Sequence, residues 1–336
     1  MARSARRPAA DKRPILLVPY QWIGDFVRCH SVVRLINARV PGRPVDVVTS
    51  ALCAPLLDYM PGARKGIVAD IPRGRLALAE NRALAEKLRP ENYGTALVMS
   101  RKWKAALAPA LAGIPERVGF VGEWRYGLLT EVRYGEKKLP RMIDQCGALA
   151  LPAGAKLPKW PLPQLKVPAK EVTAWLARRG LQKKRKVVAL CPGAVGPGKR
   201  WPEKRYAELA RRLTRAGFAV WVLGGPGEQE IANAITARGR YGRDLTGHDL
   251  RDAILALAAA DAAVSNDSGL LHVVAAIGTP AIGLFGPTSP WHWAPLNPIA
   301  ATIEAPWPRG VKGDVRARTT ADISVDKVLR AVKKAL

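Results

Sequence analysis

The segment at residues 265–287, SNDSGLLHVVAAIGTPAIGLFGP, holds the residue types best suited to binding a phosphate. An apolar run ends before Asp267, a tight turn follows at Ser268 and Gly269, and a helix is predicted over residues 270–277. The first turn of a helix leaves backbone N–H groups unpaired and lies at the positive end of the helix dipole. Because ligands of open parallel sheets bind at the carboxyl ends of strands, this turn is a candidate phosphate site.

Two side chains flank this turn. Asp267 would repel a phosphate unless it serves the turn itself, so we predict that its carboxylate orients the N–H groups. His272 follows Ser268 at helical spacing. The spacing leaves two roles open for this imidazole, which either faces the ligand or fills the space beside the strands.

A second glycine turn, GAVGPGKRWP, follows another apolar strand and provides Gly193, Ala194, Lys199 and Arg200. Gly193 and Lys199 match the G-x-x-x-x-G-K spacing of a P-loop, but Arg200 occupies the position that needs a Ser or Thr hydroxyl for magnesium. The segment is therefore predicted to cradle a diphosphate without ATPase chemistry. The alternative for Lys199 is a solvated surface lysine.

Two acids also follow predicted strands. Asp25, after Gly24, opens the first predicted helix and is either an N-cap or a carboxylate at the carboxyl end of a strand. Glu228 lies in LGGPGEQE, beside Gly224, and either caps a helix electrostatically or accepts hydrogen bonds from a ribose.

Strands and helices alternate along both halves of the chain, which predicts parallel sheets covered by helices. Strands are predicted at residues 15–19, 45–49, 66–69, 95–99, 117–121, 187–190, 218–223, 262–265 and 281–285. Helices are predicted at residues 25–38, 76–88, 103–111, 204–216, 229–237, 250–259, 270–277 and 325–336.

Prolines divide the two halves, at positions 152, 158, 161, 163 and 168. This density disfavours both helix and inner strand and predicts a stiff, extended linker. We therefore predict an α/β protein with two doubly wound, Rossmann-like domains, at residues 1–155 and 171–336, joined by a linker at residues 156–170. Their sheets are expected to face a central cleft, and the last helix has the option of packing back on the N-terminal domain. No internal repeat is visible in the sequence.

The net charge of +27, from 54 Lys and Arg against 27 Asp and Glu, predicts an anionic partner. Nucleic acid, an anionic membrane and a phosphorylated substrate all fit the charge, as does a generally basic proteome. No apolar run approaches the ~20 residues of a membrane span, and the start of the chain does not resemble a signal peptide, so we expect a cytoplasmic protein. Cys29, Cys53, Cys146 and Cys191 show no metal-binding spacing and are expected to be buried thiols.

Together these segments resemble glycosyltransferase family 9, the ADP-heptose:lipopolysaccharide heptosyltransferases, and within it the enzymes that add the second heptose. The resemblance covers nearly the whole chain. It rests on the segments PYQWIGD, GEWRYGLLTEVR, PGAVGPGKRWPEKRYAELA, NDSGLLHVVAA, LFGPTSP and TADISVDKVL. The chain differs from the family pattern at PGAVGPGKRWP, which lacks an acid, at SRKWK after the fourth strand, and in a compact region after Pro290.

The resemblance implies a two-domain GT-B fold and an inverting, metal-independent transfer of heptose from ADP-heptose to the inner core on lipid A. Asp25 would be the general base. Lys199 would bind the diphosphate, the turn at Ser268 and Gly269 would supply N–H groups, and Glu228 would bind the ribose. No Asp-x-Asp metal motif and no resident cofactor are expected.

The expected partners are ADP-heptose, a phosphorylated lipid A–Kdo–heptose acceptor and the anionic inner leaflet of the membrane, with the protein a monomer that does not bind nucleic acid. The predicted acceptor contacts are Arg101, Lys102, Lys104 and Arg125. Three other functions stay open: a transferase with another acceptor or nucleotide sugar, an inactive assembly factor, and a basic nucleic-acid-binding protein, although no nucleic-acid-binding motif is recognisable.

Overall fold

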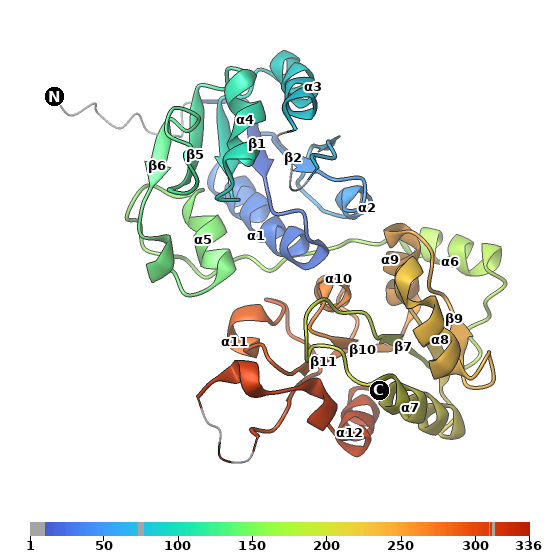
Figure 1. Ribbon diagram of the computed structural model, residues 1–336. Helices are drawn as coiled ribbons and strands as arrows, with labels where there is room; N and C mark the ends of the chain where they lie inside the picture. Colours follow the sequence, from blue (N-terminus) through green and yellow to red (C-terminus); the bar gives the residue numbers. More distant parts are fainter. Residues whose placement is uncertain (1–10, 73–76, 309, 311–312) are drawn as a thin grey trace. The chain divides into compact units, whose positions relative to one another are not determined.

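A computed structural model describes residues 11–72, 77–308, 310 and 313–336 (Figure 1). The chain forms two compact units. We call Met1–Gln21 with Cys29–Pro161 the N-terminal unit, and Trp22–Arg28 with Leu162–Leu336 the C-terminal unit. Position 76, where the second predicted helix was expected to begin, lies outside the described residues.

The N-terminal unit contains a six-stranded parallel sheet in the order β3-β2-β1-β4-β5-β6. Leu16 of β1 pairs with Asp46 of β2 and with Ala96 of β4, so β1 is a central strand. Its residues are all buried, as expected of a short apolar strand covered on both faces. The strands are β1 (Ile15–Val18), β2 (Val45–Thr49), β3 (Lys65–Val68), β4 (Thr95–Val98), β5 (Glu116–Phe120) and β6 (Glu131–Arg133). The helices are α1 (Ile23–Arg39), whose first six residues belong to the C-terminal unit, α2 (Ala54–Leu57), α3 (Leu78–Leu88), α4 (Trp103–Leu111) and α5 (Met142–Ala148).

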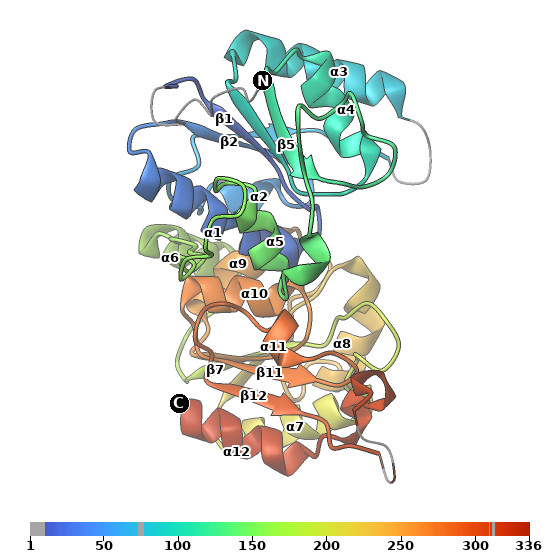
Figure 2. The same ribbon diagram turned by 90° about the vertical axis from the view of Figure 1, so that its left-hand side faces the viewer.

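The C-terminal unit contains a second six-stranded parallel sheet, ordered β12-β11-β10-β7-β8-β9. Helices α7 and α12 lie on one face of this sheet, with α9 and α10 on the other (Figure 2). The strands are β7 (Val187–Cys191), β8 (Ala219–Val222), β9 (Arg243–Asp244), β10 (Ala262–Asn266), β11 (Ala281–Phe285) and β12 (Ala301–Glu304). The helices are α6 (Ala169–Arg178), α7 (Glu203–Arg215), α8 (Gln229–Thr236), α9 (Leu250–Ala259), α10 (Gly269–Ile277), α11 (Pro290–Trp293) and α12 (Val325–Ala335). Two parallel sheets flanked by helices confirm the predicted α/β class.

Two boundaries differ from the prediction. The last helix, α12, packs against α7, β10 and β11 of the C-terminal unit. Its apolar face, formed by Val325, Val328 and Val332, is buried in that unit's core, whereas the sequence had left open that it packs on the N-terminal domain. The extended segment ends at Pro168 because α6 begins at Ala169, two residues before the predicted end of the linker.

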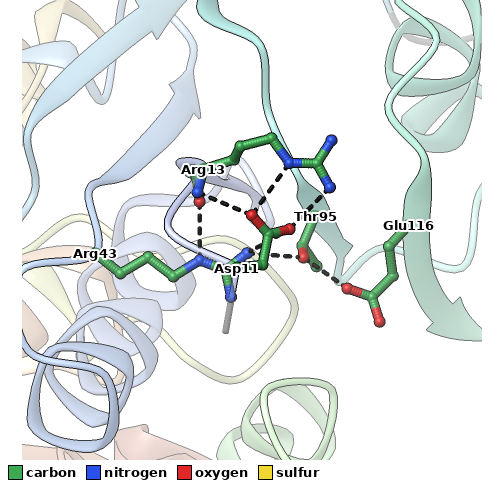
Figure 3. Close-up of polar contacts among 5 residues, drawn as sticks. All are labelled: Asp11, Arg13, Arg43, Thr95 and Glu116. Atoms are coloured by element: carbon green, nitrogen blue, oxygen red, sulfur yellow. Dashed lines mark hydrogen bonds and ion pairs between the residues drawn. The ribbon is translucent and has the colours of Figure 1, made fainter. Parts of the chain in front are cut away.

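A polar network fastens the amino ends of the strands in the N-terminal unit (Figure 3). The buried Arg43 guanidinium donates to the carbonyl of Arg13 at 2.8 Å and to Thr95 Oγ1 at 3.2 Å. Thr95 Oγ1 donates in turn to Glu116 Oε2 at 2.6 Å, and Asp11 pairs with Arg13 at 2.9 Å and with Arg43 at 3.7 Å. This edge is therefore closed by side-chain hydrogen bonds, opposite the carboxyl edge where ligands of such sheets bind.

Within the described part of the chain, no helix combines the length and the apolar character needed to cross a bilayer.

Candidate active site

The connection from β10 to α10 forms the turn predicted to bind phosphate. Ser268 is the N-cap of α10 in extended backbone conformation, with φ −145° and ψ 174°. Its hydroxyl lies 3.3 Å from the Ser265 hydroxyl, which donates to the Asn266 carbonyl at 2.8 Å. Gly269 permits a close approach, because a Cβ there would lie 2.7 Å from Ile23 Cβ. The N-terminus of α10 is thus built as predicted in its local structure.

Asp267, at the start of this turn, is held by two side chains. Its Oδ2 lies 2.8 Å from Lys199 Nζ and accepts a hydrogen bond from Thr288 Oγ1 at 2.8 Å. A buried carboxylate requires such partners, because desolvation of an unpaired charge is costly. An ion pair with Asp267 therefore holds Lys199 beside the turn. Lys199 is not a freely solvated surface lysine, which was the alternative.

The loop that carries Lys199 is held at several points. Asn266 bridges it, since its amide donates to the Pro192 carbonyl at 2.7 Å and accepts from the Trp201 N–H at 3.1 Å. Gly198 has φ +69°, a conformation that favours glycine, and its carbonyl accepts from Thr320 N and Oγ1, both at 3.0 Å. The loop is therefore presented in one conformation beside the α10 N-terminus. Asn266 was not among the predicted site residues, although its place in NDSG pointed to it.

Arg200 and Ala194 contact each other within this loop. Arg200 is exposed, and its Nε donates to the carbonyl of the buried Ala194 at 2.7 Å. This bond joins the two residues across the turn at residues 195–199.

Glu228 lies against the glycines of two connections. Its Oε2 accepts from Gly225 N at 2.8 Å. A Cβ added to Gly193 would lie 3.1 Å from Glu228 Oε1, and one on Gly224 would lie 2.9 Å from Glu228 Cβ. The missing side chains of these glycines leave the room that the carboxylate occupies. Glu228 follows β8, the second strand of its sheet, which in dinucleotide-binding folds is the strand that leads to a ribose-binding acid.

Asp25 belongs to the first turn of α1 and is its third residue, because the helix begins at Ile23. It is therefore not an N-cap, which removes one of its two predicted roles. Burial raises the pKa of the Asp25 carboxyl above its usual 3.8. The positive charges of Arg28 and Lys199 lower this pKa, and the negative charge of Asp267 raises it. The pKa of this carboxyl is raised by burial and its side chain is partly exposed, so the carboxylate is suited to accept a proton.

Arg28 is a site residue that sequence reasoning missed. Its side chain is 2% exposed, and its Nη1 lies 3.6 Å from Asp25 Oδ1. Its Nη2 donates to the Trp293 carbonyl at 2.9 Å and lies 3.2 Å from His272 Nε2. The spacing of three residues between Asp25 and Arg28 on a helix was the available signal, since such residues share one face.

His272 supports Arg28. Because a guanidinium has only donors, His272 Nε2 accepts this hydrogen bond and the imidazole is neutral. Burial, Arg28 and Lys199 hold the pKa of His272 well below its usual 6.5, in agreement with that state. Gly24 makes space for the ring, since a Cβ there would lie 2.7 Å from His272 Cδ2. His272 therefore fills the space beneath the first turn of α1.

Of the four predicted acceptor contacts, three lie on the surface and one does not. Lys102 and Arg101 are exposed and pair with Glu123 and Glu136, the latter pair at 3.1 Å. Lys104 is half-buried. Arg125 is 1% exposed, and its Nε donates to the Phe120 carbonyl at 2.9 Å. A side chain enclosed in this way is not presented to a ligand, so the prediction of an acceptor contact by Arg125 needs correction.

Among the residues that the structure describes, no group of three or more His, Cys, Asp or Glu side chains is arranged to hold a metal ion. The four cysteines are buried free thiols, as the sequence predicted. Burial raises the pKa of the Cys191 thiol to about 12, so it is protonated at neutral pH.

Comparison with known proteins gives consistent results. Residues 81–314 match the family model for glycosyltransferase family 9 (heptosyltransferase). The chain is 39% identical over 304 residues to lipopolysaccharide heptosyltransferase 2 of Escherichia coli K12, covering 86% of this chain and 87% of that protein. It is 35% identical to lipooligosaccharide heptosyltransferase 2 of Haemophilus influenzae, over 86% of this chain and 88% of the relative.

The solved structure of E. coli ADP-heptose lps heptosyltransferase II matches with a TM-score of 0.85 and 34% identity, over 96% of this chain and 98% of that one. An E. coli heptosyltransferase solved with ADP shares the fold at 20% identity, with a TM-score of 0.74. The fold is therefore the two-domain GT-B type, and the protein is a glycosyltransferase. By sequence, by fold and by the extent of the match, this chain belongs to glycosyltransferase family 9.

Proposed function

We propose that this enzyme transfers L-glycero-D-manno-heptose from ADP-heptose to the inner core of lipopolysaccharide, with inversion, as the second heptose. The observation that carries the proposal is the 39% identity to a protein named lipopolysaccharide heptosyltransferase 2, extending over 87% of that protein. The proposal also assigns a ligand to each domain. The N-terminal domain binds the acceptor and the C-terminal domain binds the nucleotide sugar.

In this proposal, Lys199, Arg200 and the N-terminus of α10 receive the diphosphate of the donor. As the bond between the sugar and the diphosphate breaks, negative charge grows on the leaving oxygen, and nearby cations and N–H groups stabilise it. Lys199 is held 2.8 Å from Asp267, so a bound phosphate would compete with that carboxylate for the ammonium group. Gly193 and Ala194 provide backbone close to the same ligand.

Glu228 receives the ribose hydroxyls. Its Oε2 is held by Gly225 N, and its Oε1 lies over Gly193, so a carboxylate oxygen is fixed in direction beside the phosphate loop. A sugar hydroxyl donates well to such a fixed carboxylate.

Asp25 acts as the general base. The acceptor hydroxyl oxygen attacks the anomeric carbon, its proton passes to the Asp25 carboxylate, and ADP leaves from the opposite face of the sugar. Arg28 keeps the carboxylate ionised and oriented, while the neutral His272 fixes Arg28. The base must be deprotonated, so the opposing effects of burial and Arg28 on its pKa set the pH range of activity.

The acceptor is a phosphorylated lipid A–Kdo–heptose, bound through Arg101, Lys102 and Lys104. Arg125 positions this segment, since its guanidinium donates to the carbonyls of Ser100 and Phe120. The acceptor's lipid would hold a monomeric, cytoplasmic enzyme at the anionic inner leaflet, where its net charge of +27 is favourable.

ADP release from ADP-heptose tests the proposal, with EDTA present and with lipid A–Kdo acceptors that carry one heptose or none. We expect release only with the monoheptosylated acceptor, unaffected by EDTA because Lys199 and Arg200 supply the positive charge. Activity on the heptose-free acceptor would assign the first transfer instead. If neither acceptor supports release, ADP-heptose transfer to this core is contradicted, and other nucleotide sugars become the substrates to assay.

A further inference from the structure

Three large aromatic side chains are exposed on neighbouring loops of the N-terminal unit. Trp124 is 92% exposed, Tyr126 64% and Tyr134 69%. Trp124 and Tyr126 follow β5, and Tyr134 follows β6 directly. The two strands are paired in parallel, and Val121 N donates to the Arg133 carbonyl at 2.7 Å, so both loops leave the same edge of the sheet. Single exposed aromatics are ordinary, but three at one edge mark a surface that binds something.

The loop that presents Trp124 and Tyr126 is anchored from within. Arg125, between them, is buried and donates from its Nε to the Phe120 carbonyl at 2.9 Å, and its other nitrogens reach Phe120 and Ser100. Gly122 lies so close to the preceding loop that a Cβ would stand 2.4 Å from the Arg101 carbonyl oxygen. The inward Arg125 thus holds its two aromatic neighbours outward.

The backbone at Trp124 is strained. Its φ is +24°, in a region that L-residues other than Asn and Asp rarely adopt. Burial does not compensate for this strain, because the indole is exposed. Strained residues that persist without a packing reason occur at binding sites more often than elsewhere.

The charge around these aromatics is positive. Three ion pairs neutralise the acids nearby, namely Arg101 with Glu136, Lys102 with Glu123, and Arg133 with Glu131. Two further lysines, Lys137 and Lys138, are exposed in the segment that follows β6. Trp and Tyr favour the boundary between headgroups and acyl chains, and lysines favour anionic headgroups, so the two features together match a bilayer surface.

We propose that Trp124, Tyr126 and Tyr134, with Lys137 and Lys138, form an aromatic rim that inserts into the headgroup region of an anionic bilayer. The rim leaves the same edge of the sheet as the segment proposed to bind the acceptor. Membrane insertion at this edge would hold the enzyme where a lipid-anchored acceptor is presented. In that respect the inference rests on the proposed function, although binding to lipid can be measured without any acceptor.

Vesicle co-sedimentation of the full chain tests the rim, with vesicles of phosphatidylcholine alone or with added phosphatidylglycerol. We expect binding to the anionic vesicles, a loss of about tenfold in affinity for Trp124→Ala/Tyr126→Ala, and about thirtyfold for Lys137→Glu/Lys138→Glu. Trp291→Ala and Lys184→Glu/Arg185→Glu are matched controls, because they alter an exposed aromatic and the same amount of charge in the C-terminal unit. Unchanged affinity in the rim variants, or an equal loss in the controls, would overturn the proposal.

Turnover of a deacylated, water-soluble acceptor separates the rim from the acceptor site. The rim variants are expected to keep wild-type turnover with that acceptor and to lose it only with acceptor embedded in vesicles. Loss of turnover with the soluble acceptor would assign the aromatics to the acceptor sugar and overturn the membrane proposal. If the wild-type chain transferred to no acceptor but still bound vesicles through the rim, the proposed function would fail while the rim was supported.

Discussion

The two sheets have the same topology but use it differently. Counted along each unit, both have the strand order 3-2-1-4-5-6, and in both the order reverses beside the first strand. The connection from β1 to α1 is short, at residues 19–22, whereas that from β7 to α7 runs over residues 192–202 and is rich in glycine. Asp25 follows the short connection, and Lys199 lies within the long one.

This difference shows how one topology provides opposite chemistries. A short connection leaves little backbone to bind a ligand, so the chemistry falls to a side chain in the first helical turn, which here is a carboxylate. A long connection with glycines at positive φ, such as Gly196 and Gly198, lets the backbone and a lysine approach an anion. In the proposed mechanism the base and the cations follow different sheets, a division that the shared topology does not decide by itself.

Asp25→Asn tests the short connection and should have the largest effect. Loss of the proton acceptor is expected to lower kcat by about 10²- to 10⁴-fold, while affinity for ADP is retained. Asp326→Asn, in the first turn of α12, is a matched control with an exposed acid and should keep full activity. Steady-state kinetics and ADP titration give the readouts, and substantial turnover by the Asn variant would rule Asp25 out as the base.

Lys199→Ala tests the long connection. Removing a charged donor is expected to weaken ADP binding by about tenfold to a hundredfold, because hydrogen bonds to charged groups contribute about 1.5–3 kcal/mol. Isothermal titration with ADP measures the change, with the exposed Lys204→Ala as control. If Lys199→Ala and Lys204→Ala bound ADP equally well, the cradle would not include Lys199.

Arg43→Met tests whether the amino edge of the N-terminal sheet serves stability alone, in contrast to the carboxyl edge of the same sheet. The substitution leaves Thr95, Asp11 and the Arg13 carbonyl without their buried donor, so the free energy of unfolding should fall by about 2 kcal/mol. Denaturant unfolding measures this fall, and kcat of the folded variant should be unchanged. A lower kcat with unaltered stability would mean that the amino edge also serves catalysis. Arg39→Met, an exposed arginine, is the control.

Arg28→Gln should produce the smallest change, a shift in the pH profile. Arg28 lowers the pKa of Asp25, so its loss should raise that pKa further above 3.8. The fraction of ionised base at a given acidic pH then falls, and the acid limb of kcat moves to higher pH. Measurement of kcat across pH in the wild-type protein and the variant tests this shift. An unshifted acid limb would leave Arg28 with only a packing role.

The sequence was sufficient to predict most of the fold. The bounds of β2, α4, α9 and β11 agree with the prediction, because their apolar runs are bounded by turn residues. The strands β6, β9 and β12 were missed. They lie at or near the sheet edges, carry few apolar residues and gain their conformation from pairing with a neighbour, which no local pattern records.

The candidate site was predictable where glycines and turns marked it. The turn at Ser268 and the loop at Lys199 both have local signatures, and their backbone is as expected. Contacts between residues distant in the sequence had no local signature. The contact of Asp267 with Lys199, the support of Arg28 by His272 and the burial of Arg125 join residues distant in sequence or turned inward by packing. Charged side chains are usually exposed, whereas Arg28, Arg125 and Asp267 are buried in this fold.

The short edge strands bear on how readily the folded chain could aggregate through its sheets. An edge strand exposes unpaired N–H and C=O groups to which other chains can add, and short, charged edges discourage that addition. The edge strands β3, β6, β9 and β12 are all short and carry charge, including Lys65, Glu131, Arg243 and Glu304. Each sheet thus ends on both sides in a short strand that carries charge and offers an intruding chain few hydrogen bonds. This protects two parallel, slow-folding sheets from aggregation.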